Sequence, residues 1–203
     1  LVAGGGLLLS NLVRYCSQRG LGGLEFLAGI PGTVGGAVIM NAGAFGKDMS
    51  TVLQSIEMVS PQGELISRDR SDLVFSYRAS SIQEGTVVVS ASLQCTRETP
   101  QIVSKRVAEY LASRKATQPL EYPSAGSVFR NPPGDYAGRL IEKTGLKGKK
   151  IGGAMISPKH ANYIVNTGGA TAEDVLALIE MAKEKVRKQT GIELEPEIRV
   201  VGR

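Results

Sequence analysis

Apolar side chains spaced three or four residues apart predict two helices in the chain before residue 116. Leu8 and Leu12 share one face of a helix over 7–19, and Gly20 follows as a C-terminal cap. A similar apolar stripe predicts a second helix over 103–115. We expect the stripe of the first helix to lie in a hydrophobic core.

A third helix is predicted near the end of the chain. Thr171 opens the sequence T-A-E-D, which is typical of a capping box at a helix start. The apolar positions that follow share one face and are Val175, Leu178, Ile179, Ala182 and Val186. Upstream, Asp135 is placed to cap a short helix that carries Leu140 and Ile141.

Alternating apolar residues predict strands in both halves of the chain. Residues 52–60 and 64–68 form a hairpin joined by a Pro-Gln-Gly turn, and 87–95 form a half-buried strand. Two shorter strands are predicted over 151–156 and 162–166. The first half is therefore rich in β structure, and the second half is mixed α/β.

The segment GLEFLAGIPGTVGGAVIMNAGAFG, residues 23–46, follows neither period, although it is too apolar for a surface loop. Its glycines let the main chain approach a flat or anionic ligand and point N–H groups at it. The spacing is neither a G-x-G-x-x-G after a strand nor a Walker loop. From glycine content alone, a tightly packed turn and a ligand cradle both stay open.

Composition and charge narrow the class of protein. Apolar residues make up 42% and charged residues 21% of the 203, which is ordinary for a globular protein. The net charge of +5 favours anionic partners. No arginine-rich helix or aromatic-interleaved basic face accompanies it, so nucleotide phosphates explain the charge as well as nucleic acid would. The basic run 143–150 is broken by glycines and is interpreted as a solvated turn.

The cysteines and the apolar runs exclude further classes. Cys16 and Cys95 are too few for a disulfide framework or a metal cluster, so we expect buried free thiols in a reducing cytoplasm. No apolar stretch reaches the roughly 18 residues that a membrane helix needs. We therefore expect a cytoplasmic protein with no membrane and no nucleic-acid partner; the sequence does not give the oligomeric state.

Four motifs in a fixed order resemble one enzyme family. They are the glycine-rich segment, SYRAS at 76–80, SAGSVFRNP at 124–132 and LEPEIRVVG at 194–202. Together they are similar to the UDP-N-acetylenolpyruvoylglucosamine reductases, over essentially the whole chain. The resemblance implies an α+β fold in which residues 1–97 form the C-terminal lobe of a two-lobed FAD-binding domain. Residues 98–203 would form an α/β substrate-binding domain.

This family binds FAD without a covalent link and reduces it with NADPH. The resemblance implies that the flavin contacts are Gly29, Ile30, Pro31, Gly32, Thr33, Gly35, Gly36, Ala37, Asn41, Ala42 and Gly43. Family members carry about a further domain's worth of chain upstream, including a loop for the FAD pyrophosphate. We therefore expect these 203 residues by themselves to bind FAD weakly and not to turn over.

The implied reaction is hydride transfer to the enolpyruvyl ether of UDP-N-acetylglucosamine enolpyruvate, which gives UDP-N-acetylmuramate for peptidoglycan synthesis. Negative charge then builds on the substrate carboxylate, so a cation or an acid should lie beside it. By resemblance, Arg78 and Glu197 occupy those positions and Ser127 donates the proton. From residue types alone, Arg78 could form an ion pair, Glu197 could be solvated, and Ser127 could bond its own turn.

Four further residues resemble substrate contacts. Lys115 matches a lysine that contacts substrate phosphate or NADPH, Asn131 a polar contact, and His160 a position near the substrate nucleotide. Tyr77 adjoins Arg78 and could equally be core packing, and a lone histidine is usually structural or solvated. Two other functions stay open: a related flavin oxidoreductase with another substrate, and a non-catalytic sugar-nucleotide-binding module. No metal is expected.

Overall fold

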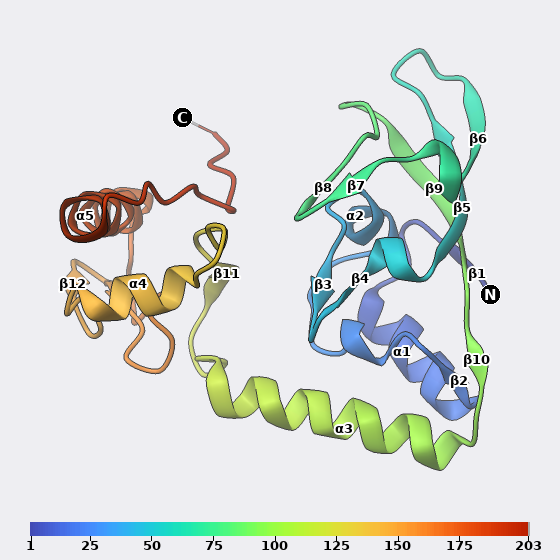
Figure 1. The fold of residues 1–203 in the computed structure, drawn as a ribbon, viewed down its shortest axis with the longest axis horizontal. Helices are drawn as coiled ribbons and strands as arrows, with labels where there is room; N and C mark the ends of the chain where they lie inside the picture. The colour runs from blue at the N-terminus through green and yellow to red at the C-terminus, as the bar shows by residue number, and fades with distance from the viewer. Residues whose placement is uncertain (203) are drawn as a thin grey trace. The chain divides into compact units, whose positions relative to one another are not determined.

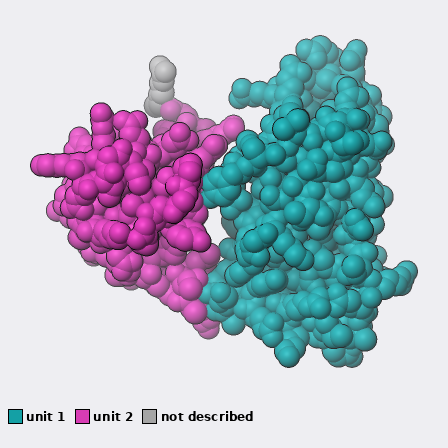
Figure 2. Space-filling view, viewed as in Figure 1, with its two compact units in different colours: residues 1–114 teal, residues 115–203 magenta. Residues whose placement is uncertain are grey.

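The computed structural model describes residues 1–202 and contains two compact units, residues 1–114 and residues 115–203 (Figure 2). Each unit combines helices with an antiparallel sheet, so the fold is α+β (Figure 1). The division falls inside helix α3 (Pro100–Thr117), most of which belongs to the first unit. The predicted functional domains, 1–97 and 98–203, stay predictions.

A four-stranded antiparallel sheet forms the centre of the first unit. Its strand order is β1 (Val2–Gly4), β9 (Val87–Leu93), β5 (Leu53–Val59) and β6 (Leu65–Asp69). Because successive side chains on a strand point to opposite faces, Ile56 on β5 and its partner Ala91 on β9 enter the same core.

Two helices contribute to that core. Helix α1 (Leu9–Gln18) buries Leu9, Leu12, Val13 and Cys16. Helix α2 (Val34–Ile39) packs against β9, and the Thr33 hydroxyl at its N-terminus accepts a hydrogen bond from the Gly36 N–H at 3.4 Å. Both cysteines are free thiols, and burial raises the pKa of Cys16 to about 12.

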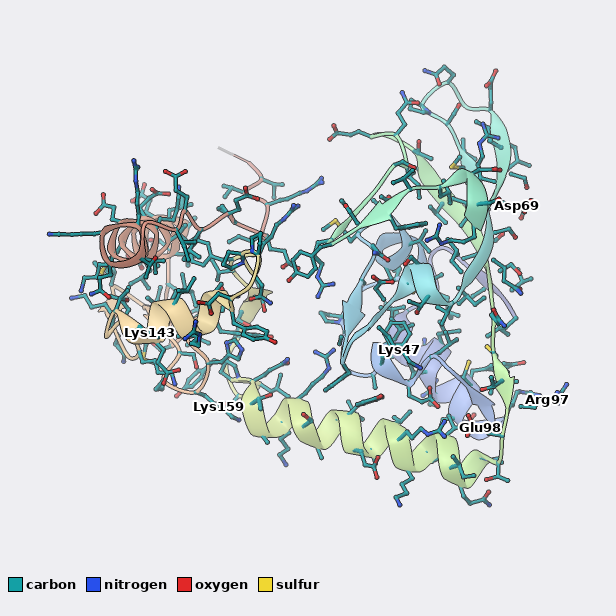
Figure 3. The ribbon with its side chains drawn as sticks, in the orientation of Figure 1. Lys47, Asp69, Arg97, Glu98, Lys143 and Lys159 are labelled. Carbon is teal, nitrogen blue, oxygen red and sulfur yellow. The ribbon has the colours of Figure 1, made fainter. Side chains whose placement is uncertain are left out.

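Short pairings complete the first unit. They are β2 (Leu21–Gly22) with β10 (Thr96–Arg97), β3 (Gly43–Ala44) with β4 (Lys47–Asp48), and β7 (Phe75–Ser76) with β8 (Ala79–Ser80). Three 3-10 turns lie at Glu25–Leu27, Met49–Thr51 and Arg70–Asp72. Arg106 on α3 pairs with Glu98 at 2.7 Å and with Glu25 at 3.3 Å, which ties the start of α3 to this unit. Figure 3 labels Glu98 close to the start of this helix.

The second unit is built on another antiparallel sheet. Its strand order is β11 (Ser124–Ser127), β14 (Tyr163–Asn166), β13 (Ala154–Ile156) and β12 (Lys150–Ile151). Helix α5 (Ala172–Thr190) packs against β12, β13 and helix α4 (Ala137–Lys143). The core between these elements contains Phe129, Ile141 and Leu178.

Most predicted elements are confirmed. The helix predicted over 7–19 is α1, the hairpin is β5 and β6, and the capping box at Thr171 starts α5. Four of the five apolar positions predicted for α5 are buried, whereas Val175 is half-buried. The helix predicted to end around 115 continues to Thr117.

Two local predictions are wrong. The strand predicted over 151–156 is a hairpin, because Gly152 takes a φ of +51° and turns the chain between β12 and β13. Asp135 does not cap α4 directly; it pairs with Arg139 and accepts the Tyr136 N–H at 2.6 Å. Glu197 lies outside the regular strands, next to an isolated bridge between Phe129 and Pro196.

None of the helices within residues 1–202 is both long enough and apolar enough to cross a membrane.

Candidate functional site

Arg78 lies at the tip of a tight hairpin in the first unit. Strands β7 and β8 are joined by Tyr77 and Arg78, and Arg78 has a φ of +56°. A left-handed conformation in a residue other than glycine costs about 1–3 kcal/mol and persists only where the surroundings enforce it. Here the Arg78 guanidinium lies 4.9 Å from the centre of the Tyr77 ring and donates to the Gly43 carbonyl at 2.8 Å.

The buried side chain of Asn41 holds this hairpin from the other side. It is 2% exposed, and its Nδ2 donates to the Ser76 carbonyl at 2.9 Å and to Asp48 Oδ2 at 3.1 Å. Its Oδ1 accepts the Ser50 N–H at 3.0 Å. Both ends of the amide are therefore bonded within the protein, and one bond reaches the residue before Tyr77.

The predicted flavin segment has an exposed part and a buried part. The exposed residues are Gly29, Pro31, Gly32 and Gly36; the half-buried ones are Ile30, Thr33, Ala42 and Gly43; the buried ones are Gly35, Ala37 and Asn41. A Cβ at Gly35 would lie 3.2 Å from the carbonyl oxygens of Gly5 and Val88, which is tighter than ordinary van der Waals contact. A Cβ at Gly32 would meet no atom within 4 Å.

Helix α3 contacts the same segment through side chains that the sequence did not single out. The Tyr110 ring stacks on Phe45 with centroids 4.2 Å apart, and the Arg114 guanidinium lies 5.5 Å from the Phe45 ring centre. A Cβ at Gly29 would lie 2.7 Å from Arg114 Cδ. The helix thus packs closely against both ends of the segment.

In the second unit, the structure brings the segments of Ser127 and Glu197 together. Ser127 ends β11 rather than lying in an isolated turn, and it pairs with Tyr163 on β14. The Glu197 N–H donates to the carbonyl of Val128, the residue after Ser127, at 2.7 Å. Ser127 and Glu197 are both half-buried.

Asn162 fixes the backbone on which this pairing depends, and sequence reasoning missed it. Its Oδ1 accepts the Phe129 N–H at 2.9 Å, and its Nδ2 donates to the Phe129 carbonyl at 2.8 Å. Its own carbonyl accepts the Val128 N–H at 2.8 Å. In the sequence, Asn162 could have been recognised only as a polar residue at the start of an apolar strand.

Two of the predicted substrate contacts, Asn131 and Lys115, take part in hydrogen bonds within the second unit. Asn131 is exposed, and its Oδ1 accepts the Ala137 N–H at 3.0 Å, so it caps α4 in place of Asp135. Lys115 is exposed, and its carbonyl accepts a hydrogen bond from Lys159 Nζ at 2.6 Å.

His160 is a half-buried member of the turn before β14. Its Nδ1 accepts the Asn162 N–H at 3.2 Å, and its ring lies edge-on to Tyr163 with centroids 5.0 Å apart. Burial lowers the pKa of His160, which favours the neutral ring that this hydrogen bond requires.

The chemistry-bearing residues thus form two groups. The first unit joins Arg78 to the glycine-rich segment through Gly43, with Tyr77 exposed beside it. The second unit joins Ser127 to Glu197 through backbone pairing. The convergence of Arg78, Ser127 and Glu197 on one substrate stays a prediction. Within residues 1–202, no group of three or more His, Cys, Asp or Glu side chains is arranged to hold a metal ion.

Comparison with known proteins defines the class first. Residues 1–68 match the model of the FAD binding domain family, and residues 118–201 match that of the UDP-N-acetylenolpyruvoylglucosamine reductase C-terminal domain. The chain is therefore a protein of the FAD-binding-domain class with a reductase C-terminal domain.

Individual relatives identify the family. The chain is 48% identical over 200 residues to the UDP-N-acetylenolpyruvoylglucosamine reductase of Syntrophotalea carbinolica, covering 98% of this chain and 66% of that protein. It is 46% identical over 202 residues to that of Moorella thermoacetica, covering 100% of this chain and 67% of the relative. The crystal structure of the Thermus caldophilus enzyme matches with a TM-score of 0.86 and 41% identity, covering 97% of this chain and 71% of that one.

The chain belongs to the UDP-N-acetylenolpyruvoylglucosamine reductase family. It spans about two thirds of the length of the curated relatives that it matches.

Proposed function

We propose that this chain forms most of an NADPH-dependent flavoenzyme that reduces UDP-N-acetylglucosamine enolpyruvate to UDP-N-acetylmuramate. The observation that carries the proposal is the strained Arg78, bonded to Gly43 of the predicted flavin segment at 2.8 Å. A fixed cation beside a flavin segment suits a reaction that builds charge on a substrate carboxylate. The family membership supports the same reaction.

The exposed backbone of the glycine-rich segment fits FAD. Gly32 and Gly36 are exposed, and a side chain at Gly32 would fill space that is open in the structure. FAD, when bound, would supply the hydride, and NADPH would be its source. We assign this part of the segment to the flavin contact; Gly35 and Asn41 support the segment from within.

The chain's own residues would carry the rest of the reaction. Arg78 would hold the substrate carboxylate with its planar guanidinium, which stays charged throughout. When hydride adds to the methylene carbon, Ser127 Oγ would give its proton to the adjacent carbon. The resulting Ser127 alkoxide must then regain a proton, and a polar neighbour is needed to stabilise it. Glu197, whose backbone N–H bonds to the carbonyl of the residue after Ser127, would stabilise the same charged intermediate by donating a hydrogen bond to it, while Ser127 transfers the single proton that the reaction needs.

Tyr77, Asn131 and His160 are proposed to contact the substrate, and Lys115 the substrate phosphate or NADPH, only through groups that their structural bonds leave available. The Asn131 Oδ1 and the His160 Nδ1 already accept backbone N–H groups. Substrate contacts would therefore use Asn131 Nδ2 and His160 Nε2. We also propose a cytoplasmic location and a role in making the peptidoglycan precursor.

Two half-reactions measured separately test this function. Stopped-flow absorbance of the full-length protein would follow flavin reduction by NADPH and then flavin reoxidation by the enolpyruvyl substrate. We expect both steps, with UDP-N-acetylmuramate identified by mass. Flavin reduction without reoxidation by this substrate would favour a related oxidoreductase with another substrate. Binding of the UDP-sugar with no bound flavin would favour the non-catalytic module.

A further inference from the structure

The glycine-rich segment and the Arg78 hairpin are connected by a chain of polar contacts. Asn41 Nδ2 donates to the Ser76 carbonyl at 2.9 Å, and the Ser80 hydroxyl donates to the Ile39 carbonyl at 2.8 Å. These bonds hold one residue on each side of the Tyr77 and Arg78 turn. Arg78 adds a third bond, to Gly43 at 2.8 Å.

Asn41 is itself fixed by the turn that follows the segment. Asp48 Oδ2 accepts from Asn41 Nδ2 at 3.1 Å, and Asp48 Oδ1 accepts from the Ser50 hydroxyl at 2.6 Å. The Ser50 N–H returns a bond to Asn41 Oδ1 at 3.0 Å. An asparagine is suited to this position because it offers a donor and an acceptor on one short, rigid side chain.

Arg70 supports the opposite end of the same hairpin. Its Nε donates to the Ser50 carbonyl at 3.0 Å, and its guanidinium lies 4.7 Å from the ring centre of Phe75, the first residue of β7. The hairpin pairs only two residues on each side, so its own ladder is too short to define the position of its tip. The surrounding contacts must do so.

We propose that Asn41 is a positioning residue for Arg78: it fixes the hairpin backbone so that the guanidinium is presented to the substrate carboxylate beside the flavin segment. The proposal rests on the proposed function for the role of Arg78. It differs from the expectation that Asn41 contacts the cofactor, because both ends of the Asn41 amide are engaged within the protein.

A double-mutant cycle in the full-length protein tests the proposal. Asn41→Ala should slow flavin reoxidation by the substrate by about tenfold to a hundredfold, since a displacement of about 1 Å in a positioned group can cost that much. Flavin reduction by NADPH and FAD content should stay near wild type. In an Arg78→Ala background, Asn41→Ala should slow reoxidation by less than about twofold, because coupled residues are not additive.

Limited trypsin digestion gives a readout that does not need activity. Cleavage after Arg78 requires the hairpin to open locally, so Asn41→Ala should speed it several-fold. The matched control is Cys16→Ala, which removes a buried side chain from the core of the same unit and lies outside the site. It should lower the melting temperature but leave both the reoxidation rate and the cleavage after Arg78 at wild-type values.

Each possible result of these experiments either supports or overturns the proposal. Additive slowing in the cycle, or unchanged cleavage after Arg78, would overturn it. Loss of FAD from Asn41→Ala with a normal rate at saturating FAD would return Asn41 to the cofactor contacts. If wild-type protein reduces its flavin but not this substrate, the proposed function fails, and the cleavage experiment still decides whether Asn41 holds the hairpin.

Discussion

Gly35 and Gly36 are neighbours in helix α2, and replacing each with alanine separates packing from ligand contact. A Cβ at Gly35 would lie 3.2 Å from two carbonyl oxygens, those of Gly5 and Val88, so these neighbours would have to give by a few tenths of an ångström. A Cβ at Gly36 would meet Thr33 Oγ1 at 3.6 Å, which is ordinary van der Waals contact. The two substitutions add the same methyl group to the same helix.

The expected free energies of unfolding change in opposite directions. Alanine is favoured over glycine within a helix by about 0.5–1 kcal/mol, and Gly36→Ala should gain that amount. Gly35→Ala gains it as well but overpacks the core, which costs about 1–3 kcal/mol, and the middle of the two ranges leaves a net loss of about 1 kcal/mol. Since 1 kcal/mol moves the melting temperature of a protein of this size by roughly 2–4 °C, calorimetry can separate the two.

The changes in FAD affinity in the two variants should not parallel the changes in their free energy of unfolding. If the flavin lies against the exposed backbone of Gly36, the added methyl takes its place, and a loss of about 1.4 kcal/mol would raise the FAD Kd tenfold. Melting should be measured on flavin-free protein, because bound FAD stabilises the folded state by mass action. A Gly36→Ala protein that binds FAD like wild type would refute the contact. A Gly35→Ala protein as stable as wild type would refute the packing argument.

Four further predictions concern the second unit. Ser127→Ala should leave flavin reduction by NADPH intact and slow reoxidation by at least about a hundredfold in stopped flow; equal slowing of both steps would mean a structural role. Burial lowers the pKa of His160, so its contribution to stability is complete above its ordinary value of 6.5 and is lost as pH falls through the lower folded value. Urea unfolding at several pH values should show this loss, and His160→Gln should remove it. Asn162→Asp cannot donate to the Phe129 carbonyl and should cost about 1–3 kcal/mol in the same assay. Thr171→Ala removes the α5 capping box and should cost about 1 kcal/mol, without affecting reoxidation.

The elements that the sequence predicted well are those whose formation depends on residues close together in the chain. Helices α1 and α5 carry an apolar face at the helical period, and α5 has its cap within four residues. The strand predicted over 151–156 failed because its apolar residues alternate across a glycine turn. Gly153 there donates to the Asp174 carboxylate at 3.2 Å, a contact with the start of α5 that no local pattern records.

The motifs nominate Arg78, Ser127 and Glu197 as site residues, and both their roles and their convergence stay predictions. The structure adds a bond from Glu197 to Val128, which joins residues far apart in the chain. The same motifs did not reveal that Asn131 caps α4 or that Tyr110 stacks on Phe45. Such pairings depend on the folded backbone, so a single sequence cannot specify them.

One buried asparagine in each unit forms hydrogen bonds to backbone close to a predicted site residue. Reactive side chains are presented from short, irregular backbone, whose peptide groups lack ladder partners and must still be satisfied when buried. Asn41 supplies a donor to Ser76 beside Arg78, and Asn162 supplies both a donor and an acceptor to Phe129 beside Ser127. Each amide takes the place of a neighbouring strand's peptide group. Aspartate would retain only the acceptor, so the choice of asparagine follows from the need for a donor and an acceptor on one short side chain.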